Sequence, residues 1–290
     1  MTRGFVAVLT GAPGRALVQA EVDTVARALP EADGARWLAP EAAEISCAAR
    51  PGPEALPHLP GVDLNILPAE GREKRLLLAD MDSTMIGCEC IDELAAAAGI
   101  KAEVAAITER TMSGDLDFED SLRARVALLE GVPQTALAEV YDASVRLNPG
   151  ARLLVRTMAS RGAHTALVSG GFSFFTERVA AAAGFAEHRA NILLFEEGRL
   201  VGRVAEPVLG RSAKAEILTE LAQQVGCVPA EAVAVGDGAN DIAMVAAVGL
   251  GVGYRPKPAL AEVADAVLQH ADLSAVLHLQ GIPTAAFVRD

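Results

Sequence analysis

The interpretation of the whole chain starts from one stretch, Leu76-Leu77-Leu78-Ala79-Asp80-Met81-Asp82-Ser83-Thr84. A short apolar run that ends at a polar turn is typical of a buried strand. A buried carboxylate costs free energy unless it is paired or bound to a metal, so acids at the end of such a strand indicate a specific structural or functional role. Two interpretations stay open here: a polar turn, since Asp and Ser are common turn residues, or an aspartyl nucleophile with an acid/base beside it.

A second apolar run is also followed by acidic residues, in Val233-Ala234-Val235-Gly236-Asp237-Gly238-Ala239-Asn240-Asp241. Its two glycines permit the close backbone approach that a ligand or metal site requires. Two Asp and one Asn form a cluster of hard oxygen ligands suited to Mg²⁺. The alternative is a glycine-rich turn that caps the following helix, which would account for Asp241 but accounts poorly for Asp237.

Two weaker signals lie elsewhere in the chain. Ser169, Gly170 and Gly171 follow a predicted strand and precede a helix that starts near Phe172, and such a turn can hold a phosphate. Lys214 lies near the start of another predicted helix, where the helix dipole does not favour a cation. Each signal is weak by itself, because Ser-Gly-Gly is a common turn and most lysines are solvated.

Short apolar strands alternate with helical stretches from residue 76 onward, which is typical of βαβ units around a parallel sheet. The predicted strands are 75–79, 165–168, 233–235 and 250–252. The insertion at 90–143 is too long for one crossover helix, so we predict a helical cap over the carboxyl edge of the sheet, where such sheets bind ligands. Residues 190–208, with a turn at 196–198, are predicted to form a hairpin.

Proline and glycine crowd residues 50–72, which predicts a linker there. Before the linker we expect strands at 5–9 and 42–48 and a helix at 15–29. The predicted division is therefore a small α+β N-terminal module at 1–72 and an α/β core at 73–290, with its cap at about 90–145. For the module, ligand binding with a regulatory role, association into a homodimer and simple packing all stay open.

Composition excludes several classes of protein. Of 290 residues, 51% are apolar and 22% are charged, which rules out disorder and a disulfide-stapled mini-protein. The net charge of −13 argues against nucleic acid or an anionic membrane as a partner. No apolar run has the length of a membrane span or the form of a secretory signal, and four cysteines are too few for a disulfide framework, so we expect a cytosolic protein.

Together, the four strand-end sets resemble the motifs of the haloacid dehalogenase superfamily, and within it the chain is similar to the phosphoserine phosphatase family of the bacterial type with an extra N-terminal module. The resemblance covers roughly residues 75–280 and rests on 80–84, 89–93, 112–118, 121–126, 169–172 and 236–241. It implies a doubly wound parallel sheet with a helical cap after the first strand. It also implies Mg²⁺-dependent hydrolysis of O-phospho-L-serine through an aspartyl-phosphate, the last step of serine biosynthesis.

The resemblance assigns roles at the phosphate end of the site. Asp80 would be the nucleophile, and Asp82 would serve as general acid and then general base. Mg²⁺ would be held by Asp80, the backbone carbonyl of Asp82 and Asp237. The groups expected to hold or orient the phosphoryl group are Ser169, the Gly170 amide, Lys214, Asn240 and Asp241.

Substrate specificity requires one acid and one base, because phosphoserine carries an ammonium and a carboxylate group. Glu89, which follows the nucleophile closely in the sequence, is the candidate for the ammonium. At about 100° per helical residue, Phe118 and Arg125 fall within about 60° of one another, whereas Arg123 lies about 140° from Phe118. Arg125 therefore shares the apolar face, and the resemblance assigns it to the substrate as well.

The insertion also contains Met112 and Phe118, which we expect to close over the ligand, although core packing is the common role of such residues. Cys88 and Cys90 lack the spacing of metal ligands and are interpreted as part of the pocket wall. The five histidines form no i, i+4 pair and receive no catalytic role.

Competing functions are a related small-molecule phosphatase or phosphotransferase, or a sensor that kept the fold without the chemistry. A sensor would be expected to have lost Asp80, Asp82 or Asp237, and all three are present. Because a protein of charge −13 repels a phosphate at long range, we expect phosphate binding to be short-ranged and dependent on Mg²⁺.

Overall fold

The computed structural model describes residues 4–112, 116–210 and 212–288. At its centre is a six-stranded parallel sheet of order β12-β11-β10-β5-β6-β7. These strands are β5 (Leu76–Ala79), β6 (His164–Phe172), β7 (Glu187–Asn191), β10 (Ala232–Gly236), β11 (Leu250–Tyr254) and β12 (Ala266–Leu268). The predicted parallel sheet is confirmed, and the two edge strands β7 and β12 were not predicted.

Alternating side chains of β5 enter two different cores, one on each face of the sheet. Leu77 and Ala79 belong to the larger core, whereas Leu76 and Leu78 belong to the smaller one. Helices α8 (Ala213–Gln224) and α9 (Ile242–Ala247) contribute to the smaller core, and α6 (Ala151–Ser160), α7 (Ser173–Ala183) and α11 (Ala275–Leu279) contribute to the larger one. A strand buried on both faces has no polar alternation, which is why its sequence is continuously apolar up to Asp80.

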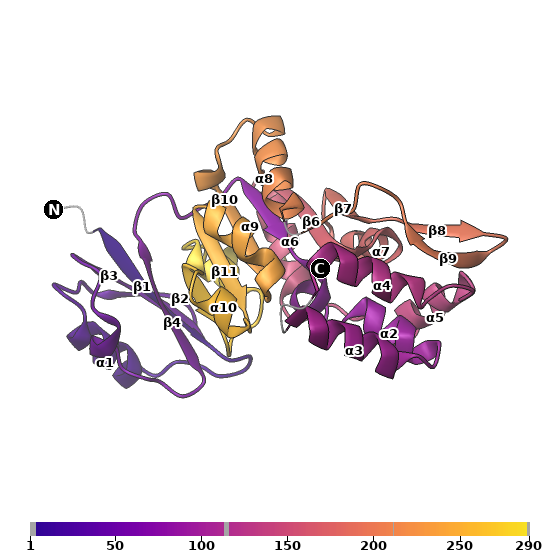
Figure 1. Cartoon of the computed structure of the whole chain (residues 1–290). Helices are drawn as coiled ribbons and strands as arrows, with labels where there is room; N and C mark the ends of the chain where they lie inside the picture. Colours follow the sequence, from indigo (N-terminus) through magenta and orange to yellow (C-terminus); the bar gives the residue numbers. More distant parts are fainter. Residues whose placement is uncertain (1–3, 113–115, 211, 289–290) are drawn as a thin grey trace.

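A helical cap follows β5, as predicted. It contains α2 (Cys90–Ala97), α3 (Lys101–Met112), α4 (Phe118–Ala127) and α5 (Thr135–Ser144). The predicted hairpin is also present, as β8 (Leu193–Glu196) and β9 (Arg199–Val204), and β9 packs against α4. In Figure 1 the cap helices lie beside this hairpin, at the end of the molecule away from the N-terminal strands.

The N-terminal residues form a separate antiparallel sheet of order β2-β3-β1-β4. Its elements are β1 (Phe5–Gly11), α1 (Gln19–Ala28), β2 (Ala35–Ala39), β3 (Ala42–Cys47) and β4 (Val62–Pro68). The predicted linker at 50–72 is wrong in part, because β4 lies inside it. Pro51, Pro53, Pro57 and Pro60 precede β4, whereas Pro68 is its last residue, and the backbone of β4 pairs with β1 along its whole length.

The N-terminal sheet contacts the core through apolar side chains of β1 and β4 and through polar groups on β4 and the segment after it. The Asn65 side chain accepts a hydrogen bond from the Val267 amide at 2.8 Å and donates one to the Val267 carbonyl at 3.0 Å, as a neighbouring strand would. The Asp63 carboxylate accepts backbone N–H groups of the three residues after β12, at 2.9–3.1 Å. Arg72 donates to the carbonyls of His278 and Leu279 at 3.0 and 2.9 Å.

The Asp63 contacts generate a prediction about stability. Asp63→Asn should lower the free energy of unfolding by about 1–3 kcal/mol. The asparagine side chain has one acceptor oxygen, whereas the backbone N–H groups now share the two oxygens of the carboxylate. Denaturant unfolding measures the change, with Asp142→Asn on the exposed surface of α5 as the control for the same chemical substitution. Equal unfolding midpoints for the two variants would contradict the prediction.

Candidate active site

The first site residues lie in a tight turn directly after β5. The Asp80 amide donates to the Val235 carbonyl of the neighbouring strand at 2.9 Å, which fixes the start of the turn. Ser83 has a φ of +56°, in the left-handed region, and lets the chain reverse within Met81–Met85. Asn148 donates to the Thr84 carbonyl at 2.8 Å and holds the far side of the turn. Asp80 and Asp82 are thereby brought to the carboxyl edge of the sheet.

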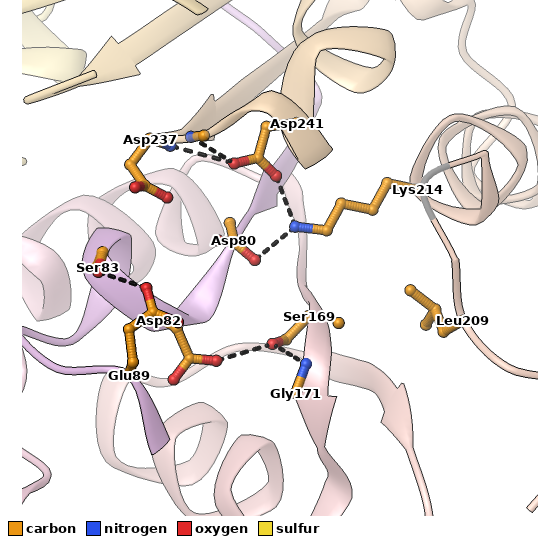
Figure 2. Close-up of polar contacts among 12 residues, drawn as sticks. Asp80, Asp82, Ser83, Glu89, Ser169, Gly171, Leu209, Lys214, Asp237 and Asp241 are labelled. Carbon is orange, nitrogen blue, oxygen red and sulfur yellow. Dashed lines mark hydrogen bonds and ion pairs between the residues drawn. The ribbon is translucent and has the colours of Figure 1, made fainter. Parts of the chain in front are cut away.

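Lys214 connects two of the acids. Its ammonium group lies 2.5 Å from Asp80 Oδ1 and 2.5 Å from Asp241 Oδ1, and all three residues are buried (Figure 2). Burial and the charge of Asp241 raise the pKa of Asp80, and Lys214 opposes that rise. Burial alone would lower the pKa of Lys214, but Asp241 and Asp80 raise it above its ordinary value. The lysine therefore stays charged between the two carboxylates.

Asp241 also fixes the loop that follows β10. Its Oδ2 accepts the amides of Asp237 and Gly238 at 3.1 and 3.2 Å. This places the loop so close to Gly236 that a Cβ atom there would lie 2.5 Å from Asp241 Cγ. The glycine at this position is required by that close approach, as the sequence pattern predicted for the loop in general terms.

Asp82 lies on the opposite side of Asp80 from this loop. Its Oδ1 accepts the Cys90 amide at 2.9 Å, and its Oδ2 is 3.4 Å from the Ser169 hydroxyl. Ser169 Oγ in turn accepts the Gly171 amide at 2.8 Å. Burial raises the pKa of Asp82, although the Cys90 amide opposes the rise, so this carboxyl group is suited to carry a proton.

The Ser169–Phe172 segment continues β6 beyond the predicted strand end, with α7 beginning at Ser173. Phe118 of the cap packs on Gly170, where a Cβ atom would lie 2.8 Å from the ring. The Asn191 side chain of β7 donates a hydrogen bond to the Gly170 carbonyl at 2.9 Å and so fixes the position of this segment. Asn191 was not predicted as part of the site.

A pocket of about 430 Å³ lies between the cap and the edge of the sheet. It is lined by most of the predicted site residues: Asp80, Asp82, Glu89, Phe118, Arg125, Ser169, Gly170, Asp237 and Asn240. Other lining residues were not singled out by the sequence, among them Ile91, Asp92, Thr108, Thr111 and Lys257. The side chain of Met112 lies outside the described part of the structure.

The cap and the segment that leads into it contribute two acids, Glu89 and Asp92, and one base, Arg125, to this pocket. Ser83 donates to Glu89 at 2.7 Å, and burial together with the charge of Asp82 raises the pKa of Glu89 to about 7. Arg125 lies on the same face of α4 as Phe118, as the helix geometry predicted, and donates to the Ser121 carbonyl at 3.3 Å. Arg123 instead points away and contacts Glu206 at 3.2 Å on the exposed surface.

The carboxylates of Asp80, Asp237 and Asp241 offer oxygen atoms that lie within 4.8 Å of one another. Asp241 is already committed to Lys214 and two amides, which leaves Asp80 and Asp237 as the acids best suited to a cation. Burial raises the pKa of Asp237, and the nearby Lys257 opposes the rise. A pair of hard carboxylate oxygens at the edge of a pocket fits Mg²⁺, which keeps room for water and phosphate oxygens.

Comparison with known proteins agrees with this geometry. Residues 74–249 match the family model of haloacid dehalogenase-like hydrolases. The chain is 43% identical to a phosphoserine phosphatase from Polaromonas sp. over 227 residues, which cover 76% of this chain and 96% of that protein. The chain belongs to the phosphoserine phosphatase family of haloacid dehalogenase-like hydrolases. Some relatives are longer: the chain is 46% identical to a phosphoserine phosphatase from Mycobacterium tuberculosis over 73% of this chain and 51% of that protein.

Solved structures extend the likeness to both sheets. A probable phosphoserine phosphatase from Vibrio cholerae matches with a TM-score of 0.77 at 28% identity, over 98% of this chain and 88% of that one. A phosphoserine phosphatase solved as a phospho-aspartyl intermediate analogue matches with a TM-score of 0.66 at 39% identity, over 71% of this chain and 98% of that one. The predicted family and fold are therefore confirmed, and members of this family generally use Mg²⁺. None of the helices in the described ranges has the length and apolar character of a membrane span.

The contact at Gly236 generates a prediction. Gly236→Ala should displace Asp241 and lower the free energy of unfolding by about 1–3 kcal/mol, because the loop after β10 cannot retreat without losing its hydrogen bonds to Asp241. Gly34→Ala is the control, since a Cβ atom there meets nothing within 4 Å. If chemical denaturation gave the same stability for both variants, the close packing at Gly236 would not matter for the fold.

Proposed function

We propose that this chain hydrolyses O-phospho-L-serine to L-serine and phosphate, with Asp80 as nucleophile and Mg²⁺ as cofactor. The observation that carries the proposal is the pocket itself. One end presents Asp80 beside the buried Lys214, and the cap presents Glu89 and Arg125. A phosphate ester whose other end carries both an ammonium and a carboxylate group matches this distribution of charge. The curated relatives named phosphoserine phosphatase support the same substrate.

In the first step a carboxylate oxygen of Asp80 attacks phosphorus while the bond from phosphorus to the serine oxygen breaks. Asp82 gives its proton to that leaving oxygen, so serine departs as a neutral alcohol. The raised pKa of Asp82 favours the protonated form that this step needs. The product on the enzyme is an aspartyl-phosphate, which divides one difficult displacement into two easier ones.

In the second step water attacks phosphorus and the bond to Asp80 breaks. Asp82, now a carboxylate, takes a proton from the water and returns to its starting state. Ser169 and the Gly170 amide would hold the phosphoryl oxygens, and Lys214 would offset their charge. Asn240, which also lines the pocket, would orient the phosphate or a water molecule.

Asp80, the Asp82 carbonyl and Asp237 would hold the Mg²⁺ ion. When bound, the ion would screen the repulsion between the carboxylate nucleophile and the phosphate and would fix the phosphoryl oxygens. Asp241, which was also predicted as a supporting residue, would act through Lys214 and through the loop that carries Asp237.

Specificity for the amino acid would come from the cap. Glu89 has a pKa of about 7 beside Asp82, and an ammonium group placed next to it would favour its ionised form. Burial lowers the pKa of Arg125, because the pocket partly removes its guanidinium group from water. A substrate carboxylate would offset this loss of hydration by pairing with the guanidinium group. Phe118 rests on Gly170 and would help the cap to exclude water from the phosphate.

The proposal also includes the division of the chain into domains and the place of the reaction in metabolism. Residues 73–290 would form the catalytic core, with its cap at about 90–145, and residues 1–72 an attached N-terminal module. The reaction would complete serine biosynthesis in the cytosol. A regulatory role and a homodimer contact of the N-terminal module remain predictions made from the sequence.

A substrate panel tests the proposed function. Phosphoserine should be hydrolysed in the presence of Mg²⁺ far faster than phosphothreonine or simple phosphate esters, and a chelator should abolish phosphate release. Asp80→Asn should show no turnover while unfolding like the wild type, because an amide is a poor nucleophile. Appreciable turnover by this variant would contradict the nucleophile assignment. Transfer of phosphate to an added alcohol would instead identify a phosphotransferase.

The two arginines of α4 provide a matched pair for the specificity prediction. Arg125→Ala should raise KM for phosphoserine by about 10- to 100-fold, because a charged hydrogen-bonded contact is lost. It should change KM little for an aryl phosphate, which has no carboxylate. Arg123→Ala removes the same charge from the exposed surface and should change neither value. Equal effects of Arg125→Ala on both substrates would remove Arg125 from the specificity pocket.

A further inference from the structure

Lys257 lies in the wall of the pocket and had no role in the sequence motifs. Its ammonium group is 3.3 Å from Asp237 Oδ2, and its backbone amide donates to the Asp237 carbonyl at 2.8 Å. The residue stands between Pro256 and Pro258, just beyond the carboxyl end of β11. Two prolines restrict the backbone on both sides, so this loop presents the lysine at a fixed place on the edge of the sheet.

The surroundings of Lys257 are mainly acidic. Asp237, Glu89 and Asp241 are the carboxylates that act on its charge. Its side chain is 59% exposed, in contrast to Lys214 at 2%. Lys214 is therefore fixed inside the protein, whereas Lys257 lies at the mouth of the pocket, where a ligand entering from solvent would meet it.

We propose that Lys257 is a positioning residue that balances the affinities of this site for its two oppositely charged ligands, the divalent cation and the phosphate ester. This inference rests on the proposed function. An ammonium group 3.3 Å from Asp237 competes with a metal ion for the same carboxylate and weakens the hold on the ion. The same positive charge offsets Asp237 and Glu89 and so favours the entry of an anion into an acidic pocket.

Lys257 would thus lower the affinity for the cation and raise the affinity for the phosphate ester. This pair of opposite effects distinguishes it from a residue that only supports the fold. Loss of a structural contact would weaken both metal and substrate binding. Loss of a balancing charge would strengthen the binding of Mg²⁺ and weaken that of every phosphate ester, whether or not the ester carries an amino-acid group. Arg125 differs again, because its effect should depend on the carboxylate of the substrate.

Calorimetric titration of Mg²⁺ into the full chain without substrate tests the metal side of the proposal. Lys257→Gln should bind Mg²⁺ about three- to tenfold more tightly than the wild type, because a nearby positive charge has been removed. Lys101→Gln, at the exposed start of α3, changes the net charge of the protein by the same amount and should bind like the wild type. Equal or weaker Mg²⁺ binding by Lys257→Gln would overturn the proposal.

Kinetics at saturating Mg²⁺ test the anion side. Lys257→Gln should raise KM about three- to tenfold for phosphoserine and for an aryl phosphate alike, with kcat changed much less. Lys257→Arg keeps the charge and should restore both KM and Mg²⁺ affinity toward the wild-type values. A KM unchanged in Lys257→Gln, or no rescue by Lys257→Arg, would also overturn the proposal. Failure of the wild type to hydrolyse phosphoserine would instead contradict the proposed function.

Discussion

The buried ion triad of Lys214, Asp80 and Asp241 is the interaction on which the rest of the site depends. The lysine is 134 residues from one carboxylate and 27 from the other, so β5, β10 and α8 must all be in place before the triad exists. Removing Lys214 would leave two carboxylates facing one another inside the protein, which is far more costly than losing a surface ion pair, whereas removing the charge of either carboxylate leaves Lys214 with one partner. Asp80, the proposed nucleophile, Lys214, the proposed phosphate-binding cation, and the loop that carries Asp237 are held by the same set of contacts.

The pocket beside this triad is lined by several acids, among them Asp82, Glu89 and Asp237. The nearby cations are placed individually: Lys214 is buried beside Asp80, Arg125 lies in the cap and Lys257 lies in the pocket wall next to Asp237. Directed charges of this kind act within a few ångströms, which is how an acidic protein can hold an anionic ester without a basic surface. Family membership and this arrangement of charge support phosphoserine as the substrate independently of one another.

The N-terminal sheet shows how a composition signal can mislead. Its prolines predicted a linker, and those before residue 62 do precede the next strand, but residues 62–68 form β4 and dock on the core. Asn65 pairs with Val267 as a strand backbone would, and Asp63 holds the loop beyond it. These contacts join residues about 200 positions apart, and polar residues in a short strand give no local sign that their partners lie so far along the chain.

The sequence by itself determined four of the six parallel strands, the helical cap and most of the residues that line the pocket, because the carboxyl ends of parallel strands meet at one edge and acids there stand out against apolar runs. Helix periodicity alone separated Arg125 from Arg123. Only the tertiary structure brought in Asn191 and Lys257 and placed Lys214 against Asp80, whereas a contact of Asp241 with Lys214 was predicted. An isolated lysine or asparagine looks the same in a sequence whether it is solvated or buried, and its role is decided by the distant residues that fold around it.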